Sequence, residues 1–187
     1  NISGNTPEEY GILCQKLSDA GVDMIEVNVS CPNVKCGGLQ YGVVPEMTAE
    51  VTEVAKKHSA VPVMVKLSPM LDWHKTITDF AGAVHEVHIV STGNECKELL
   101  LVLGRGRCAS PLVVCVNDGQ VLSYKAGDNS DNQTPISDSA LVACNTCNTE
   151  DLPAEESAND FDSSHWKYLY EPNASIMKAG CFDVLEQ

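Results

Sequence analysis

The sequence predicts an α/β protein in which parallel strands alternate with helices over the first 92 of its 187 residues. Apolar residues recur at helical spacing after Thr6 and again after Pro45, which indicates two amphipathic helices. Between and after them, residues 24–29 predict a strand, and residues 61–67 are an apolar run rich in β-branched residues, as is typical of a buried strand. Strands that alternate with helices in this way form right-handed βαβ units and a parallel sheet.

The first helix carries a clear start and stop signal. Thr6 is expected as the N-cap, Pro7 occupies the first helical position, and Glu9 completes a capping box. Gly21 is expected to end the helix. The strand over residues 24–29 follows directly.

The next elements repeat the alternation. A second helix starts at Pro45 and ends in the basic run 56–58, which suits the negative end of a helix dipole. After the strand over residues 61–67, we expect a third helix over residues 72–84 and a third strand over residues 87–90.

The C-terminal half is less regular. Residues 99–103 and 112–116 fit either two short strands or a helix and a strand. Residues 150–164 are acidic and poor in apolar side chains, so they cannot bury enough surface to offset the entropy of ordering. We therefore expect one segment over residues 1–92 and an unassigned, irregular acidic half over residues 93–187, disordered from about residue 127 to 164.

Charge and cysteine content exclude several classes of protein. Twelve Lys and Arg against 26 Asp and Glu give a net charge of −14, which argues against a nucleic acid or an anionic membrane as partner. No apolar run approaches the roughly 20 residues of a membrane span, and residues 1–4 lack the features of a signal peptide. The nine cysteines are an odd number, which favours reduced thiols in a cytoplasmic enzyme. The chain begins without Met, so we expect it to start inside a larger reading frame.

Polar residues gather where the strands end. Asn28 and Asn33 flank the thiol of Cys31, and Pro32 stiffens the backbone between them. Carboxamides donate and accept hydrogen bonds at once, which suits a planar ligand, and a thiol can act as nucleophile or proton acceptor. The alternative is a buried cysteine at a strand end with turn-forming asparagines.

Residues 26–39, which contain this cluster, resemble the active-site segment of the class 1 dihydroorotate dehydrogenases, especially the NAD-linked type B catalytic subunit. Residues 1–4 and 63–69 are similar to the same family at matching separations. The resemblance covers residues 1–92. It implies a (β/α)8 TIM barrel that carries FMN at the carboxyl ends of its strands and oxidises dihydroorotate to orotate in pyrimidine biosynthesis.

The resemblance also implies roles for individual residues. Cys31 matches the catalytic base that removes a proton from C5 of dihydroorotate, and Asn33 a residue that binds the pyrimidine. Asn28 matches a residue that touches both FMN and substrate, and Asn1 one that contacts flavin. Lys66 matches the strand-end lysine beside the flavin, where a cation stabilises negative charge on the reduced ring.

The sequence departs from the family pattern after its third strand. Ser91 and Thr92 take the place of an Asn-Thr pair that contacts the pyrimidine, and residues 93–187 bear no likeness to the glycine-rich loops that hold the FMN phosphate. A complete barrel needs about 250 residues. We therefore expect an incomplete barrel, as a fragment or as a fusion with a seam near Gly93.

Partners and alternatives follow from the same resemblance. Type B enzymes pass electrons to NAD through an iron–sulfur and FAD partner subunit, and a homodimer is a further expectation. One alternative is a non-catalytic chain that keeps the family signature but has lost flavin. Another is a redox or zinc module built on Cys144 and Cys147; no other metal site is expected.

Overall fold

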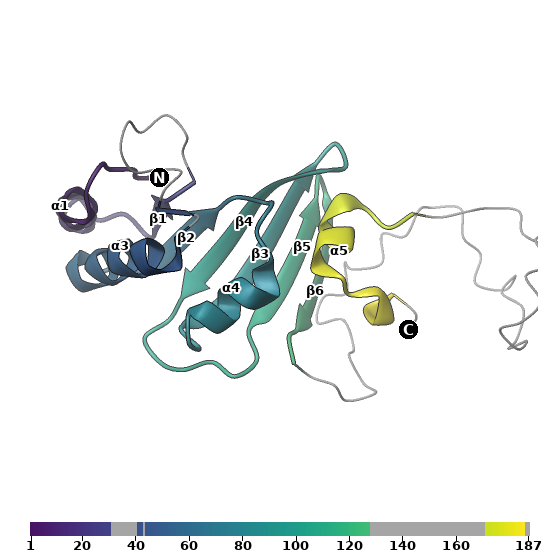
Figure 1. The fold of residues 1–187 in the computed structure, drawn as a ribbon. Helices are drawn as coiled ribbons and strands as arrows, with labels where there is room; N and C mark the ends of the chain where they lie inside the picture. Colours follow the sequence, from purple (N-terminus) through teal and green to yellow (C-terminus); the bar gives the residue numbers. More distant parts are fainter. Residues whose placement is uncertain (31–40, 43, 128–170, 186–187) are drawn as a thin grey trace, which may run out of the picture.

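The computed structural model describes residues 1–30, 41–42, 44–127 and 171–185. In these ranges six strands form one mixed sheet with the order β1-β2-β4-β3-β5-β6 (Figure 1). The strands are β1 (Ile25–Asn28), β2 (Val63–Leu67), β3 (Val84–Thr92), β4 (Glu95–Leu103), β5 (Leu112–Asn117) and β6 (Gln120–Lys125). The helices are α1 (Pro7–Asp19), α3 (Pro45–His58), α4 (Trp73–Asp79) and α5 (Ala174–Ala179), with a 3-10 turn η3 (Phe182–Val184).

Helix α1 begins and ends where the sequence predicts. The Thr6 hydroxyl accepts a hydrogen bond from the backbone N–H of Glu9 at 3.3 Å. The Glu9 carboxylate accepts from the backbone N–H of Asn5 at 2.7 Å, one residue before the expected partner of a capping box. The helix ends before Gly21, whose φ of 78° lies in the left-handed region.

The predicted parallel βαβ unit is confirmed for β1, α3 and β2. The two strands pair in parallel, with Ile25 opposite Val63 and Asn28 opposite Lys66. Helix α3 runs from Pro45 and carries the basic residues of its sequence in its last turn. The carboxyl ends of β1 and β2 therefore lie at the same edge of the sheet.

The third helix is shorter than predicted. Helix α4 ends at Asp79, and Ala81 and Gly82 follow with φ values of 50° and 86°, which no α-helix accommodates. Strand β3 then begins at Val84, the residue where the sequence analysis expected the helix to end. The prediction of a helix over residues 72–84 is therefore wrong for its second half, because a break in backbone handedness precedes the β-branched run.

An antiparallel strand interrupts the parallel sheet. Strand β4 lies between β2 and β3 and is antiparallel to both. It is reached from β3 by a two-residue turn, Gly93-Asn94, in which both residues have positive φ, 57° and 60°. The strands of residues 1–92, β1, β2 and β3, therefore share one direction as expected. The antiparallel β4 comes from the half left unassigned, because this short turn returns the chain beside β3 before any further helix.

A second hairpin extends the sheet. Strand β5 pairs in parallel with β3, and β6 pairs antiparallel with β5 across a turn at Asp118-Gly119. Of the two interpretations left open for residues 99–103 and 112–116, the structure supports two strands. The acidic run 150–164 and most of the stretch expected to be disordered lie outside the described residues.

The two faces of the sheet differ in burial. Side chains alternate between faces along a strand. One register row, Val27, Val65, Leu101, Val87 and Val113, crosses five strands and is fully buried. The adjacent row, Asn28, Lys66, Leu100, His88 and Val114, is only partly buried.

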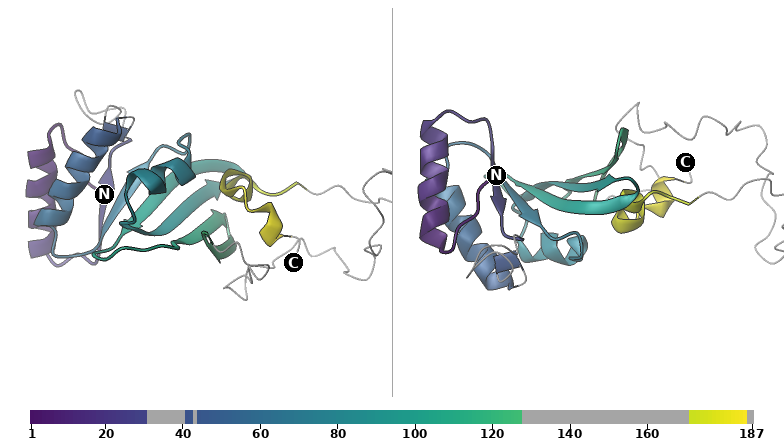
Figure 2. Two further views of the ribbon diagram at one scale, coloured as in Figure 1. Left: turned by 60° about the horizontal axis from the view of Figure 1, so that its bottom comes forward. Right: turned by 90° about the horizontal axis from the view of Figure 1, so that it is seen from above.

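The helices explain this difference. Helices α3, α4 and α5 lie on the same side of the sheet in the right-hand view of Figure 2. Helix α5 contacts β3, β4 and β5. We call the side that faces these helices the covered face and the other side the open face. The longest of the described helices, α3, has 14 residues, and none of them is long and apolar enough to cross a membrane.

Candidate strand-end site

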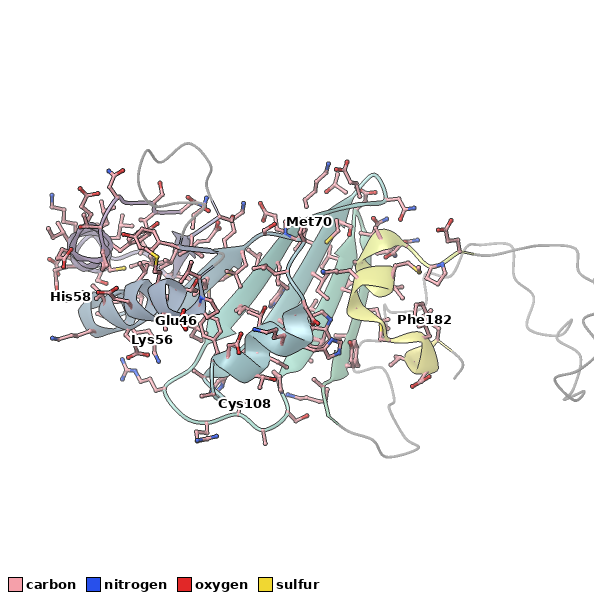
Figure 3. The ribbon with its side chains drawn as sticks, in the orientation of Figure 1. Glu46, Lys56, His58, Met70, Cys108 and Phe182 are labelled. Carbon is pink, nitrogen blue, oxygen red and sulfur yellow. The ribbon has the colours of Figure 1, made fainter. Side chains whose placement is uncertain are left out.

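The carboxyl ends of β1, β2, β3 and β5 lie along one edge of the sheet, because these four strands share a direction. Ligands bind at this edge in parallel α/β sheets. Met70, in the loop after β2, lies at this edge with its side chain turned outward and 86% exposed (Figure 3). The polar strand-end residues are therefore the first candidates for a site.

Asn28 is held in place by several hydrogen bonds. Its backbone N–H donates to the carbonyl oxygen of Ile2 at 2.8 Å, and its own carbonyl oxygen accepts from the Tyr10 hydroxyl at 3.0 Å. Its side-chain Oδ1 accepts from the backbone N–H of Ser30 at 3.1 Å and from the Ser30 hydroxyl at 3.2 Å. Tyr10, fully buried in α1, thus fixes the end of β1 from the helix side. Tyr10 was not among the residues predicted from the sequence for this site.

Lys66 lies beside Asn28 on the open face. The two residues are opposite each other in the parallel β1–β2 register, so their side chains point to the same side. The Lys66 ammonium forms an ion pair with Glu98 of β4, with 3.1 Å between Nζ and Oε1. Its side chain is 21% exposed, so the charge is only partly solvated.

Asn1 also lies next to β1. Its side-chain amide donates to the Glu26 carboxylate, and Ile2 forms a parallel bridge with Val27. Glu26 is opposite Met64 and two residues before Asn28, which places it on the open face. Asn1, Asn28 and Lys66 are therefore brought to one region, around the end of β1.

Ser91 is separated from this group. It is opposite Asn117 in the parallel β3–β5 register, and both side chains belong to the covered face with Val87 and Ile89. Ser91 is 1% exposed, and neither its Oγ nor the Oδ1 of Asn117 has a hydrogen-bond partner among the described residues. Thr92 is exposed at the turn. The structure therefore does not bring Ser91 to Asn28 and Lys66.

The remaining members of the predicted cluster, Cys31 and Asn33, lie outside the described residues, as do Cys144 and Cys147. The described residues stop at Ser30, two residues after β1, and resume at residue 41. The roles expected for these residues stay predictions.

Other thiols lie on the covered face. Cys115 and Cys181 are buried and share a hydrogen bond, which raises the pKa of Cys115 together with its burial and lowers the pKa of Cys181. Burial raises the pKa of Cys14 in α1 to about 11. The thiols of Cys14 and Cys115 therefore stay protonated and pack like small apolar side chains. No group of three or more His, Cys, Asp or Glu that could hold a metal ion occurs in the described part of the chain.

A groove of about 350 Å³ lies between α3 and α4. Leu67 and Leu103 line it together with Thr52, whose buried hydroxyl has no partner among the described residues. The groove lies on the covered face, so it is distinct from the region of Asn28 and Lys66.

Comparison with known proteins finds a family match over the first half of the chain. A family model described as dihydroorotate dehydrogenase matches residues 1–101, more than half of the chain. The chain belongs to the dihydroorotate dehydrogenase family. A second model, described as a ferredoxin-like domain, matches residues 168–187. The dihydroorotate dehydrogenase match ends inside β4, two residues before that strand does.

Curated relatives of the dihydroorotate dehydrogenase family match the same part of the chain. The catalytic subunit of dihydroorotate dehydrogenase B (NAD(+)) from Desulforamulus reducens is 52% identical over 88 residues, which are 46% of this chain and 27% of the relative. The subunits of the same name from Exiguobacterium sibiricum and Geobacillus kaustophilus are 48% identical over 87 residues and 53% over 70 residues, covering 46% and 37% of this chain and 27% and 22% of those relatives. The chain thus spans about a quarter of the length of these relatives. No solved structure matches.

Membership of the dihydroorotate dehydrogenase family fits an α/β sheet with polar residues at its strand ends. The contact of Glu98 with Lys66 and the two hairpins were not predicted from the sequence. Glu98 contacts Lys66 only because β4 turns back beside β2, a pairing that no local pattern encodes. The β5–β6 hairpin does carry a signal, since Asp118-Gly119 follows the β-branched run 112–116.

Proposed function

We propose that this chain supplies the first strands and the flavin-facing residues of a dihydroorotate dehydrogenase, which oxidises dihydroorotate to orotate with FMN in pyrimidine biosynthesis. The observation that carries the proposal is the pairing of Asn28 with Lys66 on the open face of two parallel strands. These are the residues for which the family resemblance implies contact with flavin.

The residues around the end of β1 fit the ring system of a flavin. That ring presents carbonyl oxygens and an N–H along one edge, so it needs both donors and acceptors. Lys66 offers an ammonium, while Asn28 and Asn1 offer carboxamides that can do both. These three residues would hold the ring, and FMN would supply a hydride acceptor there.

The chain's own chemistry then centres on Cys31. We assign its thiolate as the base that takes the C5 proton of dihydroorotate at Sγ. Asn33 binds the pyrimidine through its carboxamide, and the exposed Thr92 remains a candidate for the same ligand, whereas the buried Ser91 does not. Lys66 opposes the negative charge that builds up beside it as the substrate is oxidised.

We further propose an electron-transfer partner. The relatives are named as NAD(+)-linked type B catalytic subunits. By analogy, this chain would pass electrons to NAD through an iron–sulfur and FAD subunit, and it would form a homodimer in the cytoplasm. Co-purification of a yellow-brown partner with the tagged full chain from its own host tests this point.

Paired cysteine variants of the full chain test the proposed function. Wild-type protein incubated with FMN should retain the visible absorption of bound flavin after gel filtration and should turn over dihydroorotate. Cys31→Ala should lose turnover and keep flavin, because the thiol takes the proton and does not hold the cofactor. Cys36→Ala is the matched control and should keep both. Loss of turnover in Cys36→Ala but not in Cys31→Ala would show that the wrong thiol has been assigned.

One observation favours a second candidate, a non-catalytic chain that keeps the family signature without binding flavin. Beside β2, where a parallel barrel continues with its next parallel strand, this chain places the antiparallel strand β4. Equilibrium dialysis of the wild-type chain against FMN separates the two candidates. Retention of about one FMN per chain supports the dehydrogenase, and no retention supports the non-catalytic chain.

A further inference from the structure

The Lys66–Glu98 ion pair joins the family-matched strand β2 to the antiparallel strand β4. Lys66 is opposite Leu100 in the β2–β4 register, and Glu98 is two residues from Leu100 on the same face. Residues in this diagonal position are within reach of long side chains. The 3.1 Å separation of Nζ and Oε1 makes this a close ion pair, and the two side chains are 21% and 37% exposed.

The other described carboxylates of the open face near Lys66 have donors of their own. Glu26, the diagonal neighbour on β1, accepts from the Asn1 amide. Glu86 of β3 contacts Nε2 of His88 at 2.8 Å. Glu98 is therefore the carboxylate that engages Lys66, and it competes with any anionic or carbonyl-bearing ligand for the same ammonium.

We propose that Glu98 is a positioning residue that sequesters the Lys66 ammonium and so weakens ligand binding on the open face. The ion pair must open before Lys66 can face a ligand. The identity of that ligand as flavin rests on the proposed function above, whereas the sequestration of Lys66 does not.

Chemical labelling of the full chain tests the sequestration without any cofactor. Acetic anhydride acetylates free lysine amines, and mass spectrometry gives the rate at each lysine. In Glu98→Gln, Lys66 should be acetylated about threefold faster than in wild type, in line with the loss of a partly exposed ion pair. Glu98→Asp should lie between the two, because its shorter arm keeps the charge but lengthens the contact.

The same strand offers a matched control. Glu95 of β4 pairs with Lys97. Glu95→Gln should speed acetylation of Lys97 and leave the acetylation rate of Lys66 unchanged. Glu98→Gln should speed acetylation of Lys66 and leave that of Lys97 unchanged. Circular dichroism shows whether each variant folds. If one does not, the same test is made on wild-type protein at rising NaCl concentration, which should speed acetylation of Lys66 because salt screens the ion pair.

FMN binding then separates this inference from the proposed function. Fluorescence titration should give an FMN affinity about fivefold higher for Glu98→Gln than for wild type, and Lys66→Met should remove the gain. An unchanged Lys66 labelling rate in Glu98→Gln, or equal FMN affinities for Glu98→Gln and wild type, overturns the inference. Faster labelling with no FMN uptake by any variant supports the sequestration and overturns the proposed function.

Discussion

The unit β1–α3–β2 and the hairpins β3–β4 and β5–β6 share one sheet but are paired in different ways. In the first, two parallel strands are joined through a 14-residue helix, and helix packing sets their register. In the hairpins, turns of two residues set the register directly. The first region carries Asn28 and Lys66, and the second supplies Glu98, which contacts Lys66.

The comparison teaches that a family signature can be kept while its surroundings change. Asn28 and Lys66 need only β1 and β2 to lie side by side on one face. The strand next to them can then run in either direction. What changes with that direction is the set of side chains that reach Lys66, and here a carboxylate does so.

The largest expected effect concerns the central strand that joins the two regions. Leu101 of β4 is fully buried on the covered face between Val65 and Val87. Leu101→Ala should lower the free energy of unfolding by about 3 kcal/mol, because it removes buried methyl groups and leaves a cavity. Leu100→Ala, its neighbour on the open face, should cost about 1 kcal/mol. Equal losses in urea denaturation would show that the two faces are equally packed.

A smaller change in stability is expected at the two hairpin turns, and it should differ between them. Gly93 has a φ of 57° and open space around it, whereas Gly119 has open space but no positive φ. Gly93→Ala should therefore destabilise the protein by about 1.5 kcal/mol through backbone strain alone. Gly119→Ala should change stability by less than about 0.5 kcal/mol. Thermal unfolding of the two variants measures the difference, and similar shifts would mean that conformation at Gly93 is not limiting.

A change of similar size is expected in α1, the helix before the parallel unit β1–α3–β2, when its N-cap is removed. Thr6→Ala removes the acceptor for the Glu9 N–H at the start of α1 and should cost about 1 kcal/mol. Gln15→Ala, which removes an exposed contact with Asp19 in the same helix, should cost only a few tenths. Urea midpoints of these variants compare the two. A larger loss of stability for Gln15→Ala than for Thr6→Ala would show that surface contacts of α1 contribute more than its N-cap.

The smallest effect is a pH dependence at α4. Asp72 accepts hydrogen bonds from the backbone N–H groups of Lys75 and His74, and these lower its pKa despite an opposing desolvation. A carboxylate with a lowered folded-state pKa stabilises the protein above its ordinary pKa of about 4, and this contribution is lost as pH falls through the folded value. Asp72→Asn, which still caps the helix, should match wild type below that range and lose only the pH-dependent part. A stability difference that stays constant with pH would contradict this.

Local signals in the sequence were sufficient for the parallel region. Thr6 with Pro7, and Pro45, set helix starts that the structure confirms, and the β-branched run 61–67 contains β2. Asn28 and Lys66 lie side by side because each lies at the end of one of two parallel strands, which finish at a common edge. Each of these inferences depends only on residues close in sequence or on a general rule of βαβ units.

The position of β4 could not be predicted in the same way. Residues 95–103 fit a strand, but nothing in them states which neighbours the strand takes or in which direction. The end of α4 was missed because Ala81 adopts a positive φ that its residue type does not favour. Ser91 takes the place of a pyrimidine-contacting residue in the family pattern, but the face on which it lies depends on the register of β3, which the hairpin turn sets.

The turn at Gly93-Asn94 also has a consequence for the order in which the sheet assembles. Hairpins joined by two residues form within about 1–10 μs, because closing so short a loop costs little chain entropy. Pairing β1 with β2 instead requires closure across more than 30 residues. We therefore expect β3–β4 and β5–β6 to form first and to offer β4 as a template edge, onto which β2 and then β1 are added. On this route the strands that carry the family's signature are the last to join the sheet.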